Sequence, residues 1–335
     1  MRLIYVIYLF LLLSSCAMTT PFPTKINGVS FVASRDSISD KHVQPMLDFH
    51  ANYASVMPFG FIRDISHPEI QYNSNRQWFG ETKVGVKQYV NTLKKEGLFV
   101  MMKPQIWVWR GEFTGNIKMA TEEDWRSLED SYTKFILDYA LVAQEVHVDI
   151  FCIGTELENF IDKRPNYWKQ LIKDIRQVYY GKLTYAANWN EYTKTSFWED
   201  LDYIGIDGYF PVSDLKTPTV EDCKIGLEPW KKEIKSYYDT FKKPIIFTEF
   251  GYRSVDFSGK QPWRSDREMV EVNLEAQTNA TQAFFETFWN EDWVAGGFIW
   301  KWFHNHEQAG GVQDSQFTPQ NKPANNIVLH YFSNY

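Results

Sequence analysis

Short apolar runs and longer amphipathic segments alternate along this chain from about residue 26 to its end. The apolar runs predict strands at 27–32, 54–59, 98–103, 150–153, 183–187, 203–206, 245–247 and 297–300. The segments between them predict helices at 39–50, 82–96, 121–144, 167–179, 195–200, 228–241 and 265–289, and a last helix at 325–332. Capping-box patterns open two of these helices, at Thr121 and at Ser265. Such alternation is typical of a parallel sheet with helical crossovers.

Eight strand–helix units within residues 26–335 are the number found in a TIM barrel. A doubly wound open sheet is the alternative α/β fold. That fold usually carries a glycine-rich phosphate-binding turn after its first strand, and residues 27–31, Asn-Gly-Val-Ser-Phe, lack one. No linker or low-complexity stretch divides the chain. We therefore expect a single-domain (β/α)8 TIM barrel over residues 26–335.

The first sixteen residues have the pattern of an export signal. Arg2 precedes an apolar run at 3–13 that is too short for a permanent membrane span. The run ends in Leu-Ser-Ser-Cys16, which resembles the bacterial lipobox and implies that Cys16 is lipidated. Residues 17–25 then form a tether. We expect an exported, lipid-anchored protein of the bacterial envelope, with the outer membrane favoured, at the periplasmic side or the cell surface; the alternative is an ordinary signal peptide with an incidental cysteine.

Composition excludes some partners and favours others. The net charge of −7 and pI near 5.6 argue against nucleic acid. Aromatic residues make up 17% of the chain, with 13 Trp, and flat aromatic faces suit stacking on sugar rings. Cys152 and Cys223 are expected to be buried and inert rather than a disulfide framework. His304, His306 and Glu307 have a spacing that suits a metal, but no third partner is evident, so neither metal nor cofactor is expected.

Two stretches each place a glutamate at the end of an apolar strand. Glu156 follows the strand in Asp149–Asn159, and Glu249 follows the strand in Pro-Ile-Ile-Phe-Thr-Glu-Phe-Gly, residues 244–251. A carboxylate at the mouth of a buried strand is costly unless the site uses it. In a barrel these fourth and seventh strands face each other at the carboxyl-terminal end, where the chemistry of this fold occurs. A lone glutamate most often pairs with a nearby Lys or Arg, but two in matching contexts indicate a two-carboxylate site.

Two carboxyl groups that flank a bond can cleave a glycoside. One protonates the leaving oxygen, and the other acts as nucleophile or as base on the opposite face of the sugar. In a retaining enzyme the two groups lie about 5–5.5 Å apart. The two glutamates therefore predict a glycosidase.

The motifs around these glutamates resemble those of a known family. Glutamates on strands four and seven are the pattern of the clan A retaining glycoside hydrolases. The segments Phe-Cys-Ile-Gly-Thr-Glu-Leu-Glu (151–158), Ile-Phe-Thr-Glu-Phe-Gly-Tyr (246–252), Phe-Ile-Trp-Lys-Trp-Phe (298–303) and Phe-Thr-Pro-Gln-Asn-Lys-Pro-Ala (317–324) are similar to glycoside hydrolase family 113. The resemblance covers the mature chain and implies a β-1,4-mannanase with Glu249 as nucleophile and Glu156 as acid/base. One departure is Thr155, where the clan often has an Asn that binds the sugar 2-hydroxyl.

Further residues at the strand ends are candidates for substrate binding. Tyr209 is expected to donate a hydrogen bond to the nucleophile, and Trp300 is expected to lie under the sugar at the cleavage point. Glu158 and Asp207 are expected to form salt bridges or caps; the alternative is that each is a spare carboxylate in the cleft. The remaining candidates are Lys103, Gln105, Trp107, Trp109, Asn188 and Trp189. For Trp107 and Trp109 the alternative is packing in the core.

The resemblance thus implies double displacement on β-1,4-mannan or manno-oligosaccharides, and we expect a monomer. The alternatives within the clan are a β-glucanase and an exo-β-mannosidase. A non-catalytic glycan-binding lipoprotein is a further alternative, but such a binder has no use for two facing carboxylates.

Overall fold

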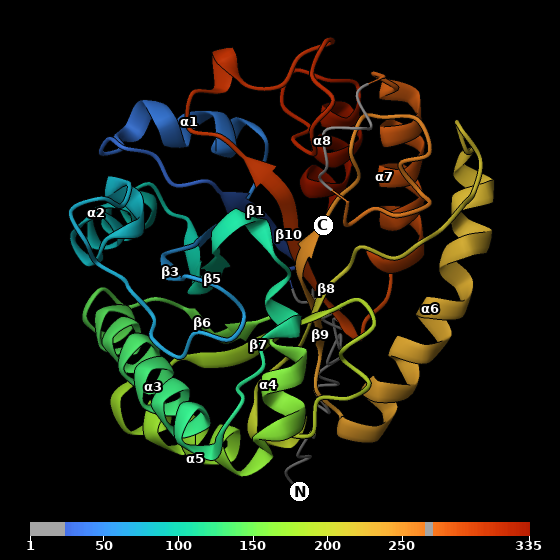
Figure 1. The fold of residues 1–335 in the computed structure, drawn as a ribbon. Coiled ribbons are helices and arrows are strands. Elements are labelled where there is room, and N and C mark those ends of the chain that lie inside the picture. The colour runs from blue at the N-terminus through green and yellow to red at the C-terminus, as the bar shows by residue number, and fades with distance from the viewer. Residues whose placement is uncertain (1–23, 265–270) are drawn as a thin grey trace, which may run out of the picture.

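Eight parallel strands close into a barrel in this computed structural model, which describes residues 24–264 and 271–335. The order around the barrel is β1-β10-β9-β8-β7-β6-β4-β2, so strands that follow each other in the chain are neighbours (Figure 1). The strands are β1 (Ile26–Phe31), β2 (Tyr53–Val56), β4 (Phe99–Met102), β6 (Ile150–Thr155), β7 (Lys182–Asn188), β8 (Ile204–Asp207), β9 (Ile245–Phe250) and β10 (Val294–Trp302). The predicted TIM barrel is confirmed.

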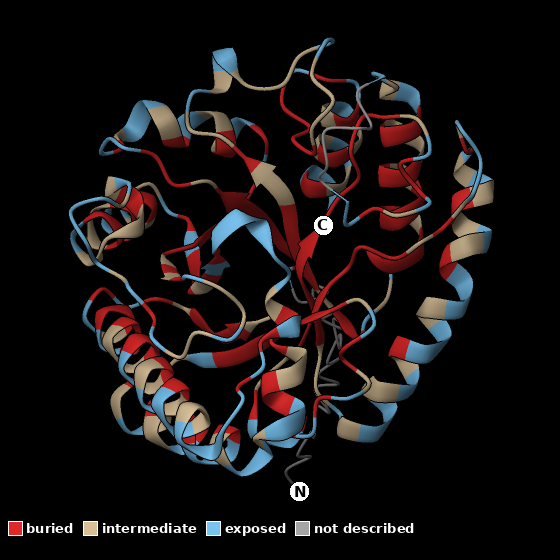
Figure 2. Cartoon of the chain, in the orientation of Figure 1, coloured by how far each residue is buried: buried red, intermediate tan, exposed pale blue. Residues whose placement is uncertain are grey.

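Helices surround the barrel and turn their buried faces toward it (Figure 2). They are α1 (Asp40–Asp48), α2 (Lys83–Lys95), α3 (Glu122–Glu145), α4 (Glu158–Lys163), α5 (Pro165–Val178), α6 (Val220–Phe241), α7 (Leu274–Phe288) and α8 (Ala324–Asn334). Short 3₁₀ turns lie at Phe79–Glu81, Trp109–Gly111, Thr114–Asn116, Trp198–Asp200 and His306–Gln308. Within the described ranges, no helix has the length and apolarity needed to cross a membrane.

The core has two parts. The larger fills the space between strands and helices, and it includes buried Trp168, Trp198 and Trp289. The smaller lies inside the barrel and consists of Ile26, Met101, Ile150, Cys152, Ala186, Ile246 and Phe298. Cys152 and Cys223 are both free and buried, as expected. The packed interior closes the barrel below the site, as is usual for this fold.

A small second sheet was not predicted. Strands β3 (Phe59–Ile62) and β5 (Gln105–Val108) pair in parallel with each other, apart from the barrel. Each follows a barrel strand after a proline, Pro58 or Pro104. Because proline has no N–H to donate to a ladder, the barrel strand ends there and the chain resumes pairing beyond it. Trp107 is thereby placed on a strand rather than in a loop.

Several helix boundaries differ from the prediction. Helix α7 begins at Leu274, where the Asn273 side chain accepts the Ala276 N–H at 2.9 Å; the capping box expected at Ser265 falls on residues outside the described ranges. Helix α6 begins at Val220, well before the predicted 228, because Thr219 and Asp222 form a capping box ahead of an internal proline. The helix expected at 195–200 is only a 3₁₀ turn, and α4 was not predicted.

Candidate active site

Glu249 accepts three hydrogen bonds at the carboxyl-terminal end of β9. The Tyr209 hydroxyl donates to Oε2 at 2.5 Å, and the Gln105 amide donates to Oε1 at 3.2 Å. The Lys103 ammonium donates to the same Oε1 and forms an ion pair with it. Glu249 is only 7% exposed. Tyr209 therefore lies where the sequence predicted, and both oxygens of this carboxylate are held by donors.

Lys103, expected among the sugar-binding residues, is instead fully buried beneath Glu249. Its ammonium also lies 3.9 Å from Asp207 Oδ1, and Asp207 pairs in register with Glu249 across β8 and β9. Burial alone would lower the pKa of Lys103, but the carboxylates of Asp207 and Glu249 outweigh burial and raise it. Lys103 is thus a permanent cation on the floor of the site.

Glu156 is held quite differently. Its backbone lies in the left-handed region at φ 51°, with its N–H bonded to the Ala186 carbonyl at 2.8 Å. Such a conformation is uncommon for a residue with a side chain and persists where the surroundings enforce it. Within the described ranges no side chain or backbone group donates to its carboxyl. Burial, then the charges of Asp207 and Glu249, raise the pKa of Glu156 well above its usual range.

Packing explains why β6 delivers its glutamate in this way. A Cβ on Gly154 would lie 2.7 Å from the Tyr132 hydroxyl and 3.0 Å from Trp168, so only glycine fits two residues before Glu156. The Thr155 hydroxyl, where the clan often has an Asn amide, is buried and has no partner in the described residues. At this position the chain therefore presents a hydroxyl and no side-chain amide.

A buried acid that sequence reasoning missed supports the neighbouring strand end. Glu191 accepts the Asn188 N–H at 2.9 Å and the Tyr185 hydroxyl at 2.6 Å. Burial raises the pKa of Glu191 to about 7. Asn188, 9% exposed, uses its side-chain oxygen to accept the Trp189 N–H at 2.8 Å. Nothing in the sequence distinguishes Glu191 from a surface glutamate, because the turn that buries it follows only from the fold.

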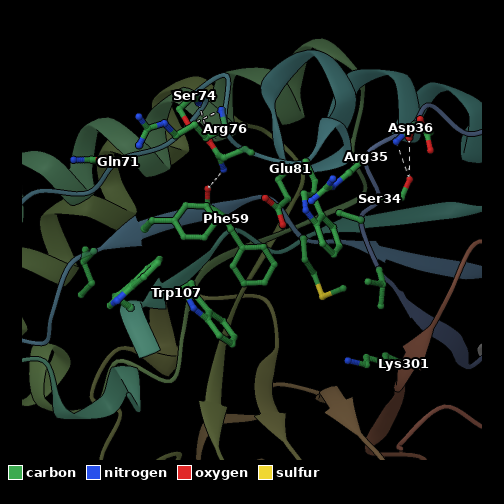
Figure 3. A pocket seen from close by; sticks show the side chains of 18 of the residues that line it. Ser34, Arg35, Asp36, Phe59, Gln71, Ser74, Arg76, Glu81, Trp107 and Lys301 are labelled. Carbon is green, nitrogen blue, oxygen red and sulfur yellow. Dashed lines mark hydrogen bonds between the residues drawn. The ribbon is translucent and has the colours of Figure 1, made fainter. Parts of the chain in front are cut away.

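Two groups of aromatic side chains lie near the strand ends, and the Trp300 ring of one group lies 5.9 Å from the Lys103 ammonium, the partner of Glu249. Trp189 stacks on Trp263, with ring centres 4.9 Å apart, beyond β7. A cavity of about 1400 Å³ is lined by Trp300, Lys301 and Trp107, among others, and neither glutamate is among its lining residues. Figure 3 shows Phe59 and Trp107 along one wall of this cavity, with Lys301 reaching in from β10. Trp107 and Trp109, 50% and 66% exposed, are surface-facing aromatics and not core residues.

The other predicted candidates have structural partners. His304 lines the cavity and packs against His42, while His306 stacks on Trp302. No group of three metal-ligating side chains occurs in the described part of the chain. Glu158 pairs with Lys194, as the salt-bridge interpretation expected. Cys16 lies outside the described residues.

Comparison with known families places this site in context. The model of glycoside hydrolase family 113 matches residues 33–322, which include both glutamates. The chain belongs to glycoside hydrolase family 113. This family 113 chain is therefore a glycoside hydrolase.

Solved structures share the fold of this family 113 protein. The GH113 β-mannanase of Alicyclobacillus acidocaldarius, solved with ManMIm, superposes with a TM-score of 0.81 at 22% identity, covering 92% of this chain and 97% of that one. A GH113 β-1,4-mannanase complex gives 0.81 at 20% identity, with 93% and 99% covered. A β-glucuronidase from Ruminococcus gnavus gives 0.58 at 14% identity, with 87% and 45% covered. Among curated proteins, none matches the sequence.

Proposed function

We propose that this hydrolase cleaves β-1,4-mannosidic bonds inside mannan chains with retention of configuration. The observation that carries the proposal is the pair of unlike carboxyl groups. Glu249 accepts three hydrogen bonds. The Glu156 carboxyl accepts none from the described residues, and its pKa is raised. A retaining glycosidase needs one ionised carboxylate and one carboxylic acid at the same bond.

The two environments assign the two roles. Glu249 attacks the anomeric carbon while Glu156 gives its proton to the leaving oxygen, and a glycosyl ester on Glu249 results. The ester removes the negative charge of Glu249, which is one of the causes of the raised pKa of Glu156. Glu156 then takes a proton from water, which attacks the anomeric carbon and restores the Glu249 carboxylate.

The cavity favours endo over exo action. It extends from Trp300 along β3 and β5 as far as Trp78 and Arg76, with a volume of about 1400 Å³. A site for a single terminal sugar needs an enclosing wall next to the sugar at the cleavage point. An aromatic-lined cavity of this size that begins at Trp300 instead has room for several sugar units next to the site.

Mannan is favoured as the substrate because the structural neighbours of this chain include β-1,4-mannanases. The alternative is a β-glucanase. Thr155 has no amide to donate a hydrogen bond to the sugar 2-hydroxyl, and the configuration of this hydroxyl distinguishes mannose from glucose.

The test is hydrolysis of mannan, glucomannan and cellulose by the purified protein, with product lengths measured over time. We expect mannan and glucomannan to yield mixed manno-oligosaccharides from the earliest time points. Release of mannose alone would indicate exo action, and cleavage of cellulose without mannan would indicate a glucanase. No cleavage of any of the three would contradict the proposal.

A further inference from the structure

Asp207 is a buried carboxyl that the double-displacement scheme does not use. It is 0% exposed, and the Thr248 hydroxyl donates to its Oδ1 at 2.7 Å. The same Oδ1 lies 3.9 Å from the Lys103 ammonium, whose nearer partner is Glu249. Its other oxygen, Oδ2, is buried with no hydrogen-bond partner in the described residues. One buried cation therefore lies between two buried carboxyl groups, only one of which reacts.

We propose that Asp207 is a positioning residue that takes over the Lys103 ammonium when Glu249 becomes a glycosyl ester. The inference rests on the proposed function, since it requires the ester to form. Asp207 would stabilise the covalent intermediate through Lys103 and would not contact the substrate.

The reason is the cost of a buried charge without a partner. In the free protein Lys103 is paired with Glu249. Attack of Glu249 on the anomeric carbon forms an ester bond, breaks the glycosidic bond and leaves Glu249 neutral. Lys103 would then be a fully buried ammonium without its nearest counterion, which is unfavourable. Asp207 is the carboxylate already close enough to compensate it.

Glu249 influences the pKa of Asp207. Burial and the Glu249 charge raise this pKa to about 8, with Glu191 adding to the shift and Lys103 and Thr248 opposing it. The ester removes the Glu249 charge, which lowers the pKa of Asp207 and favours its carboxylate beside Lys103. Glu156 becomes a carboxylate when it gives its proton to the leaving oxygen, so ester formation leaves the net charge of Glu156, Asp207, Lys103 and Glu249 together unchanged. Hydrolysis of the ester reverses these changes.

The experiment uses a 2-deoxy-2-fluoro-mannosyl fluoride, which forms a long-lived ester, on the full chain. Two rates are measured for Asp207→Asn: inactivation, which reports ester formation, and reactivation, which reports ester hydrolysis. Because Lys103 then lacks a counterion in the ester, we expect inactivation to slow roughly tenfold and reactivation to quicken severalfold. A merely structural role would slow both rates together and would overturn the inference.

A double-mutant cycle isolates Lys103 as the intermediary. In the Lys103→Met background, Asp207→Asn should no longer move the two rates in opposite directions. If the opposite effects persist there, Asp207 does not act through Lys103. Asp149→Asn is the matched control, since Asp149 also pairs with a lysine, Lys94, but at the other end of the barrel. In this variant the ratio of the inactivation rate to the reactivation rate should equal that of the wild type.

A milder variant covers the case in which Asp207→Asn does not fold. Thr248→Val removes the hydroxyl that donates to Asp207 and keeps the side-chain shape, so it should shift both rates in the same opposed directions by a smaller factor. Unchanged rates in this variant would contradict the proposed pairing of Lys103 with Asp207 in the ester. Failure of the wild-type chain to be labelled at all would overturn the proposed function itself, and this inference with it.

Discussion

At the scale of single residues, the hydrogen bond from Tyr209 to Glu249 makes a direct prediction. Tyr209→Phe removes one of three donors and keeps the ring in place. A hydrogen bond to a charged group contributes about 1.5–3 kcal/mol, so kcat/KM on mannan should fall about 10- to 100-fold. Steady-state kinetics measures the loss. The control is Tyr192→Phe, whose hydroxyl donates to Glu233; an equal loss there would contradict a role for Tyr209 in the site.

The raised pKa of Glu156 predicts how kcat/KM falls at high pH. Its pKa is raised by burial and then by Asp207, Glu249 and Glu191, against the opposing charge of Lys103. The carboxyl therefore keeps its proton to a higher pH than an ordinary glutamate does, and kcat/KM on mannan should fall as pH rises through the raised pKa. In Glu156→Gln, turnover of an aryl mannoside whose leaving group needs no proton should lack this fall. A fall unchanged in the variant would assign it to another group.

At the scale of elements, the prediction from sequence succeeded where the pattern is local. The barrel strands were found because each is an apolar run buried on both faces, and Glu156 and Glu249 were found because each follows such a run. Strands β3 and β5 were missed because each is a short segment after a proline, and the two can pair only once the barrel has formed and brought them side by side. The contact of Lys103 with Glu249 was missed for a similar reason. A lysine after a strand normally reaches solvent, and only barrel closure directs this one inward.

The β3–β5 sheet carries Trp107 to the cavity wall, and its role is testable. Trp107→Ala removes a half-exposed aromatic face from the sheet. We expect kcat/KM to fall roughly tenfold on long manno-oligosaccharides but little on a short aryl mannoside. The control is Tyr180→Ala, since Tyr180 is 75% exposed and precedes β7 at the other end of the barrel. Equal losses on long and short substrates would remove Trp107 from the extended subsites.

At the scale of the whole molecule, we propose that Cys16 anchors the barrel in the bacterial envelope. The proposal rests on the lipobox-like Leu-Ser-Ser-Cys16 and the apolar run before it. Cys16→Ala should abolish membrane association while the barrel keeps its activity, as measured by fractionation and by hydrolysis of mannan. Recovery of the wild-type protein unlipidated in the soluble periplasmic fraction would contradict the anchor.

The proposed mechanism depends on two carboxyl groups with different roles at one bond. The most direct measurement is the configuration, by NMR, of the azide product formed by Glu249→Ala and by Glu156→Ala from an activated aryl β-mannoside. Without its nucleophile, Glu249→Ala should use azide on the opposite face and give the inverted α-mannosyl azide. With its nucleophile intact, Glu156→Ala should still form the ester and give the retained β-mannosyl azide. The reverse pair of configurations would exchange the two roles, and full activity of both variants on mannan would contradict the two-carboxylate site.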